Sequence, residues 1–221
     1  MPTRNPRQLW VEGKDDNAMV QSLCAFHDLP RGLFEVHVAE GVEKLMEAFP
    51  VQLRARGLER FGIVVDADSD LRARWTAVRD QLVAGGYGSV PNDPSPAGTV
   101  LRAENLPVFG VWIMPDNAAP GVLEDFAAAL IPVGDTLWSH AADAIDRIPE
   151  ENRRFPIVRK AKAHIHTWLA WQESPGSPMG QAITKGDLDG RAPLAEAFVA
   201  WLRRLMVSDA PDPGAAMAEA G

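Results

Sequence analysis

Acidic residues follow two apolar segments at the points where strands are expected to end. Glu12 follows a candidate strand at residues 8–11, and Asp66 and Asp68 follow the clearest strand in the chain, the continuous apolar run at residues 61–65. If these segments are neighbouring parallel strands, their carboxyl ends meet at one edge of the sheet, where ligands of open α/β sheets collect. Asp66 and Asp68 alternate, so in an extended chain both carboxylates leave the same side. Such carboxylates repel one another unless a hard cation lies among them, and Mg²⁺ prefers oxygen ligands.

The same acids are also open to a structural interpretation as helix caps. An acid in the first turn of a helix stabilises it by about 0.3–1 kcal/mol. Capping accounts well for the acids inside or beside the expected first turns, which are Asp15, Asp16, Asp68 and Asp70. It accounts less well for Glu12 and Asp66, because both lie on the strand side of the turn. From the residues alone, both interpretations stay open.

The elements that must position these acids follow from hydrophobic periodicity. Strands are expected near residues 8–11, 33–38, 61–65 and 108–114. Amphipathic helices are expected after each strand, with apolar stripes within residues 19–24, 42–53, 71–82 and 122–130, the second of them bent or restarted near Pro50. The alternation of strands and helices predicts an α/β fold with a mainly parallel central sheet and helices on both faces.

The second part of the chain has a different pattern. After Pro132 no strand is expected, and apolar stripes within residues 158–169 and 194–205 predict two further helices. We therefore expect an α/β domain over residues 1–131, a C-terminal helical extension packed on it over residues 132–207, and a flexible tail over residues 208–221.

Two segments resemble the motifs of TOPRIM domains. Residues 11–16, Val-Glu-Gly-Lys-Asp-Asp, resemble the opening motif, a strand that ends in Glu-Gly with an Asp shortly after it. Residues 64–68, Val-Val-Asp-Ala-Asp, resemble the second motif, an Asp-x-Asp after a later strand. The resemblance implies a TOPRIM-like fold with a metal-dependent site that acts on nucleic-acid phosphodiesters, as in topoisomerases, primases and the overcoming-lysogenisation-defect (OLD) nucleases.

Over about residues 7–205 the chain is also similar to a family of small bacterial TOPRIM-like proteins. The segments that carry this similarity are Trp112–Asn117, Gly121–Asp125 and Lys160–His164. Topoisomerases and primases carry large additional nucleic-acid domains that this chain lacks. OLD-type nucleases carry an ATPase domain, and no Gly-x-x-x-x-Gly-Lys-Ser/Thr motif occurs here. The resemblance therefore implies a separate ATPase partner protein.

The TOPRIM resemblance implies roles for individual acids. Glu12 would be a metal ligand and a general acid or base, and Asp66 and Asp68 would bind Mg²⁺ or Mn²⁺. Asp16 and Asp70 would assist them.

The OLD resemblance implies two further roles. Glu124 resembles the later acid that holds a second metal ion, and its alternative interpretation is an exposed acid in the first turn of a helix. Lys162 would steady the developing charge on a phosphate, as OLD-type sites use a lysine.

A basic cluster precedes and opens the helix near residue 160, and it consists of Arg153, Arg154, Arg159, Lys160 and Lys162. Arg159 and Lys160 are the candidate phosphate-binding residues, which would reconcile an acidic chain with a nucleic-acid partner. The alternative is a solvated helix face.

Three functions follow from these patterns. The first is a Mg²⁺- or Mn²⁺-dependent nuclease or related phosphodiester-transfer enzyme. The second is a haloacid-dehalogenase-type phosphatase, because residues 64–68 also resemble that family's motif, with Asp66 as nucleophile and Asp68 as general acid. The third is a non-catalytic TOPRIM-fold binding module that acts with a partner. We favour the nuclease, with DNA rather than RNA as its partner.

Composition limits the remaining possibilities. The chain has 221 residues, 46% of them hydrophobic, one cysteine and a formal charge of −8. These values exclude a disulfide framework and a generally basic nucleic-acid coat. No apolar run approaches the roughly 20 residues of a membrane span, and residues 1–6 lack the apolar core of a signal peptide. We expect a cytoplasmic protein without a membrane partner, and a homo-oligomer stays open.

Overall fold

The computed structural model describes residues 5–207, so the tail expected at residues 208–221 lies outside the described residues. Within that range the chain forms a five-stranded sheet and eight α-helices. The strands are β1 (Arg7–Val11), β2 (Glu35–Val38), β3 (Arg60–Asp66), β4 (Thr99–Leu101) and β5 (Val108–Met114). The helices are α1 (Lys14–Phe26), α2 (Val42–Gln52), α3 (Leu71–Ala84), α4 (Leu123–Ala128), α5 (Thr136–Asp146), α6 (Lys160–Ala170), α7 (Met179–Lys185) and α8 (Pro193–Met206).

The sheet is mostly parallel. Its strand order is β2-β1-β3-β5-β4, and only β4 runs antiparallel, against β5. The central strands β3 and β5 are continuous apolar runs, as expected for parallel strands that are buried on both faces. Because β1 pairs directly with β3, their carboxyl ends lie side by side. The expected α/β architecture with a mainly parallel sheet is confirmed, and the first and third strands adjoin, which is the condition for their acids to meet.

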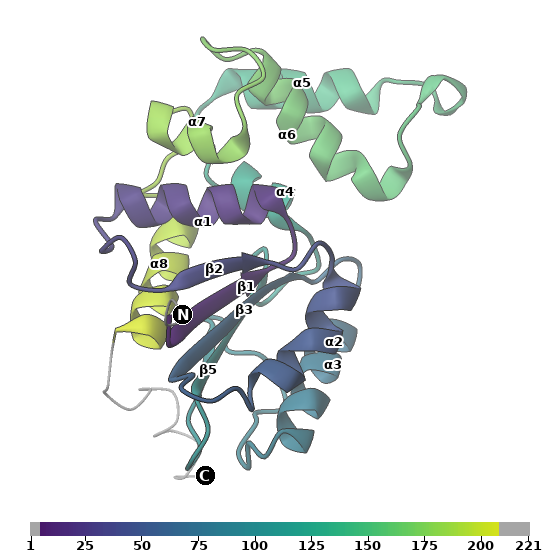
Figure 1. The fold of residues 1–221 in the computed structure, drawn as a ribbon. Helices are drawn as coiled ribbons and strands as arrows, with labels where there is room; N and C mark the ends of the chain where they lie inside the picture. The colour runs from purple at the N-terminus through teal and green to yellow at the C-terminus, as the bar shows by residue number, and fades with distance from the viewer. Residues whose placement is uncertain (1–4, 208–221) are drawn as a thin grey trace, which may run out of the picture.

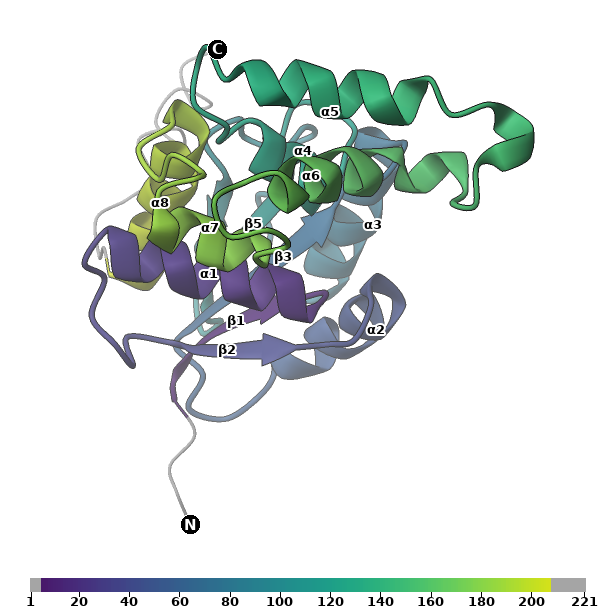
Figure 2. The same cartoon turned by 90° about the horizontal axis from the view of Figure 1, so that it is seen from above.

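Helices cover both faces of the sheet (Figure 1). On one face, α2 and α3 pack against alternate strand residues such as Phe61, Ile63 and Val65. On the other face, α1, α4, α6, α7 and α8 share a core with Val64 and Trp112. The helices α5 and α6 run side by side beyond α4, as Figure 2 shows from above. The carboxyl edge of the sheet, where the acids lie, is therefore reached by helices of both faces.

Two glycines allow α8 to lie close against the sheet. Gly62 of β3 is the register partner of Gly110 of β5. A Cβ atom at either position would come within 2.6 Å of the Leu205 side chain. Because real Cβ contacts are essentially never that short, larger residues at this pair would push α8 away from the sheet.

Several elements differ from the expectations. No strand was expected at residues 99–101, where the short β4 forms, and α5 and α7 were not expected either. The second helix is one element that contains Pro50 in its last turn rather than two pieces. Among residues 5–207, the structure has no helix with the length and apolar character that a membrane crossing requires.

Candidate active site

The corner between β1 and α1 contributes two acids. Glu12 directly follows β1, and its Oε1 accepts a hydrogen bond of 2.8 Å from the Asp66 backbone amide. Asp16 lies in the first turn of α1, where its Oδ2 accepts a 3.0 Å bond from the Gly13 amide. Asp16 therefore caps the helix as the structural interpretation expects, yet it is only 7% exposed. Capping and participation in a site are compatible for this residue.

Asp66 ends β3 and lies at the centre of the contacts. Its Oδ1 accepts a 3.0 Å hydrogen bond from the Leu123 amide, at the start of α4. Its carbonyl oxygen accepts a 2.8 Å bond from Arg74 Nε. Through these bonds and the Glu12 contact, Asp66 joins the ends of β1 and β3 to α3 and α4.

Glu124 in the first turn of α4 is buried, with 9% of its surface exposed. The alternative of an exposed first-turn acid is therefore wrong for this residue. Its Oε1 lies 3.1 Å from Lys162 Nζ, which comes from α6. The same ammonium lies 3.7 Å from Asp15 Oδ2. Lys162 thus bridges the N-terminal turns of α1 and α4, and Glu124 is a buried carboxylate whose charge it balances.

The pKa values show that these carboxylates form one electrostatic unit, which we call the acidic cluster: Glu12, Asp16, Asp66 and Glu124. Burial raises the pKa of Asp66 to about 8, and repulsion from the other three members and from Asp68 adds to the shift. Burial and repulsion from Glu12 and Glu124 raise the pKa of Asp16 to about 7. Burial also raises the pKa of Glu12. The cluster thus gathers more carboxyl groups than its surroundings keep ionised at neutral pH.

The structure separates Asp68 and Asp70 from the acidic cluster. Asp68 is exposed, and its φ of +54° belongs to the left-handed region, so the extended geometry expected for Asp66 and Asp68 is wrong. Its Oδ2 instead accepts a 2.8 Å bond from Arg74 Nη2. Asp70 caps α3, because its Oδ1 accepts a 2.9 Å bond from the Ala73 amide. Asp68 thus lies at the rim of the cluster, and Asp70 has a structural role.

The candidate phosphate-binding residues also lie apart from Lys162. Lys160 Nζ is 2.9 Å from Asp146 Oδ1 on α5. Residues two apart on a helix point about 200° from each other, which is why Lys160 and Lys162 meet different helices. Arg159 is exposed at the end of a short 3₁₀ turn, Ile157–Arg159. Neither residue is brought together with the acidic cluster.

Arg74 is a residue of the site that the sequence patterns did not indicate. It lies on α3 among the inward-facing positions Leu71, Trp75 and Val78, where an apolar residue is expected. A charged residue in that stripe was the available signal. The structure explains the departure, because Arg74 reaches Asp66 and Asp68 at the carboxyl end of β3.

The donor set of the acidic cluster suits a hard cation. Glu12, Asp16 and Asp66 each use one carboxylate oxygen for a backbone amide, which leaves a second oxygen on each. Carboxylate oxygens are the ligands that Mg²⁺ prefers. Across residues 5–207, however, no three His, Cys, Asp or Glu side chains are already arranged as a metal-ion shell. Cation binding would require some of these side chains to turn.

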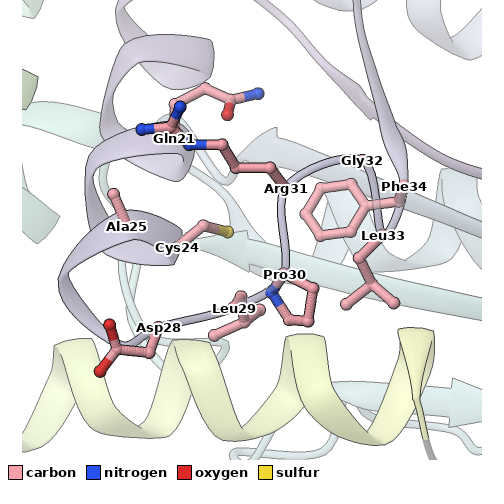
Figure 3. Close-up of a pocket in the computed structure, with 10 residues that line it drawn as sticks. All are labelled: Gln21, Cys24, Ala25, Asp28, Leu29, Pro30, Arg31, Gly32, Leu33 and Phe34. Atoms are coloured by element: carbon pink, nitrogen blue, oxygen red, sulfur yellow. The ribbon is translucent and has the colours of Figure 1, made fainter.

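A separate pocket lies at the opposite end of α1 from the acidic cluster (Figure 3). It is lined by the last turns of α1, including Cys24, and by the loop before β2, including Arg31 and Phe34. Burial raises the pKa of the Cys24 thiol to about 11, so the sulfur is protonated at neutral pH. This pocket offers no activated nucleophile to a ligand.

The fold and these side chains define a class, a mostly parallel α/β protein with buried carboxylates at the carboxyl edge of its sheet. The chain belongs to the family described as "Protein of unknown function (DUF3226)", whose model matches residues 6–207. No curated protein and no solved structure matches the chain significantly.

Proposed function

We propose that this protein is a Mg²⁺- or Mn²⁺-dependent nuclease that hydrolyses phosphodiester bonds at the acidic cluster. The observation that carries the proposal is the convergence of three other acids, two from the β1–α1 corner and one from α4, around Asp66, whose pKa burial and their repulsion raise to about 8. A fold gains nothing from burying like charges together, since uncompensated buried charge is costly. A divalent cation would remove that cost.

Strand adjacency supports a TOPRIM-like site. The acid that follows β1 and the acid that ends β3 belong to neighbouring parallel strands, and Glu12 contacts the Asp66 amide directly. These two residues carry the resemblance to the two TOPRIM motifs. The TOPRIM assignment within the α/β class is part of this proposal.

Each residue has a proposed role. Glu12, Asp66 and Glu124 would hold the cation, with Asp68 as a further ligand at the rim. The cation supplies stabilisation of charge on phosphate oxygens and a more acidic water. Glu12 is also the candidate general acid or base, and burial raises its pKa toward the range where such a group works. Lys162 would orient a phosphate oxygen through its ammonium group, which already lies beside Glu124.

The proposed substrate is DNA. The chain carries a formal charge of −8, so a polyanion would meet repulsion except where cations gather. Lys160 is partly neutralised by Asp146, which weakens its role in phosphate binding, whereas Arg159 is exposed. The OLD resemblance adds a separate ATPase partner to this proposal.

The experiment is metal-dependent cleavage of plasmid and single-stranded DNA by the purified chain. Wild type is compared with Glu12→Gln and Asp66→Asn, both isosteric changes that remove one ionisable carboxyl group from the cluster. Glu47→Gln is the matched control, because Glu47 is an exposed acid on α2 outside the cluster. Thermal melts establish that every variant is folded.

Cleavage that requires metal, survives Glu47→Gln and disappears in both cluster variants would establish the nuclease. Cleavage that survives Glu12→Gln and Asp66→Asn would assign it to a contaminant or another site. No cleavage together with a metal-induced rise in melting temperature would point to a required partner protein. No cleavage and no metal response would favour the non-catalytic binding module.

A further inference from the structure

Arg74 contacts two successive parts of the segment that ends β3. Its Nε donates a 2.8 Å hydrogen bond to the Asp66 carbonyl oxygen, and its Nη2 donates a 2.8 Å bond to Asp68 Oδ2. The Arg74 side chain is only 17% exposed, whereas that of Asp68 is 59% exposed. The guanidinium is therefore the anchored partner, and it restrains the carboxylate of a residue at the surface.

The backbone of Asp68 is held separately from its side chain. Its φ of +54° lies in the left-handed region, which is uncommon for a residue other than glycine. Two backbone hydrogen bonds with Gly121, of 2.9 and 2.8 Å, pair this residue with the loop before α4. These bonds hold the Asp68 backbone, but they leave its side chain free to rotate. Arg74 supplies the missing contact to the side chain.

We propose that Arg74 is a positioning residue that holds the Asp68 carboxylate at the rim of the acidic cluster, where it serves as an outer ligand for the divalent cation. This inference rests on the proposed metal-dependent function. It deepens that function by assigning the residue that orients one ligand. In metal sites, groups that orient ligands through hydrogen bonds are worth about 10- to 100-fold in metal affinity or activity.

A simpler role for Arg74 predicts the opposite change in cation affinity when the residue is replaced. The positive charge of Arg74 opposes the rise that burial causes in the pKa of Glu12. In this simpler role, Arg74 would be no more than a counter-ion for the acids. Removing a counter-ion leaves more negative charge for a divalent cation and strengthens its binding. Removing a positioning residue weakens binding. The direction of the change therefore separates the two roles.

The test is Mn²⁺ binding to the full chain, followed by calorimetry and by the loss of the free Mn²⁺ signal in electron paramagnetic resonance. The variants are Arg74→Gln, Asp68→Asn, the double variant and Arg74→Lys, which retains the charge but not the two-point contact. Arg72→Gln is the control, since Arg72 is an exposed arginine on the same helix. Thermal melts accompany each sample, and Arg74→Lys keeps the test valid if Arg74→Gln does not fold.

We expect about 10-fold weaker Mn²⁺ binding for Arg74→Gln and for Asp68→Asn, with no further loss in the double variant, because Arg74 acts through Asp68. Arg74→Lys should also bind more weakly than wild type, and Arg72→Gln should not differ from it. Unchanged or tighter binding in both Arg74 variants, or fully additive losses in the double variant, would overturn this inference alone. A wild-type chain that binds no Mn²⁺ would overturn the proposed function and this inference together.

Discussion

The Asp66 backbone amide donates a 2.8 Å hydrogen bond to Glu12 Oε1, so the residue that ends β3 is held by the residue that follows β1. The bond extends the pairing of β1 and β3 by one step beyond their ladder, which ends at Val11 and Val64. Glu12 thus has two separable properties, a hydrogen-bond acceptor that links two strands and a negative charge in the acidic cluster.

Two substitutions of Glu12 should separate these properties. Glu12→Gln keeps an acceptor for the Asp66 amide and removes a carboxyl group whose pKa burial raises, so the free energy of unfolding should not fall, whereas Mn²⁺ binding should fall at least about 10-fold. Glu12→Ala removes both, and it should destabilise the fold by about 1–3 kcal/mol, because a partly buried amide loses its acceptor. Urea denaturation and calorimetric Mn²⁺ titration measure the two effects. Equal stability of both variants would contradict a structural role for the bond.

Glu12→Gln also separates the nuclease from the phosphatase alternative. A haloacid-dehalogenase-type phosphatase would use Asp66 as nucleophile and would not need Glu12. Hydrolysis of p-nitrophenyl phosphate that survives Glu12→Gln and disappears in Asp66→Asn would favour the phosphatase. A metal-dependent DNA cleavage that both substitutions abolish would exclude it.

Asp66 should make the protein less stable as the pH rises. Its pKa is about 8 in the folded chain and near 3.8 when the chain is unfolded. Between these values the folded state holds a proton that the unfolded state has lost, so the free energy of unfolding falls as the pH rises. Without metal, Asp66→Asn should therefore gain at least about 1 kcal/mol relative to wild type between about pH 5 and pH 8.

Urea denaturation at several pH values measures this gain. Asp80→Asn, an exposed acid on α3, is the control and should give a difference from wild type that does not change with pH. If the stability difference between Asp66→Asn and wild type stays constant across the range, Asp66 is not a protonated buried acid.

Lys162→Met should destabilise the chain at neutral pH. The substitution leaves Glu124 without its cation, and the Glu124 side chain is only 11% exposed. Because Lys162 itself is 47% exposed, solvent screens the pair, and we expect a loss of about 1 kcal/mol. Added Mg²⁺ should recover part of the melting temperature if it takes over the charge of Glu124.

Lys160→Met is the matched control for this prediction. It removes the ion pair between Lys160 of α6 and Asp146 of the neighbouring helix α5, and both of these side chains are half-exposed. Its effect should be smaller and insensitive to Mg²⁺. A similar response of both variants to Mg²⁺ would argue against a cation site at Glu124.

Gly121→Ala should disturb the loop that leads into α4, the helix that carries Glu124. Gly121 has a φ of +148°, and a Cβ atom there would lie 2.8 Å from Asp125 Oδ2 and 2.9 Å from Pro115 Cδ. We expect a loss of about 1–3 kcal/mol in chemical denaturation, with weaker Mn²⁺ binding. Gly88→Ala is the control, because a Cβ atom at Gly88 meets nothing within 4 Å. Equal effects of the two substitutions would contradict the close packing around Gly121.

Much of the fold could be predicted because buried parallel strands require continuous apolar runs. The run at residues 108–114 coincides with β5, and the apolar stripe at residues 71–82 lies within α3. β4 could not be predicted in the same way, because it has three residues and forms only where β5 presents its edge. The short helix α7 was equally difficult to predict, because seven residues give little periodicity and a helix of this length depends on packing against its neighbours.

At the site, too, some residues could be placed from the sequence and others could not. Glu12 and Asp66 could be placed together because neighbouring parallel strands bring their ends together. The direction of Asp68 could not, since alternation assumes an extended backbone and the left-handed φ of Asp68 breaks it. The stripe of α3 marks Arg74 as unusual, but its role could not be predicted, because its partners are a carbonyl oxygen and a carboxylate that the fold brings within reach.

The glycine pair beneath α8 has a consequence for how the chain acquires its structure during synthesis. Leu205 covers Gly62 and Gly110, and the carbonyl oxygen of Leu205 accepts a 2.8 Å hydrogen bond from Arg60 Nη1 at the start of β3. On the ribosome, all five strands emerge before α8 does, so the part of the nascent sheet at Gly62 and Gly110 stays uncovered until this helix follows. A nascent chain halted before α8 would therefore expose this apolar part of the sheet to chaperones and proteases.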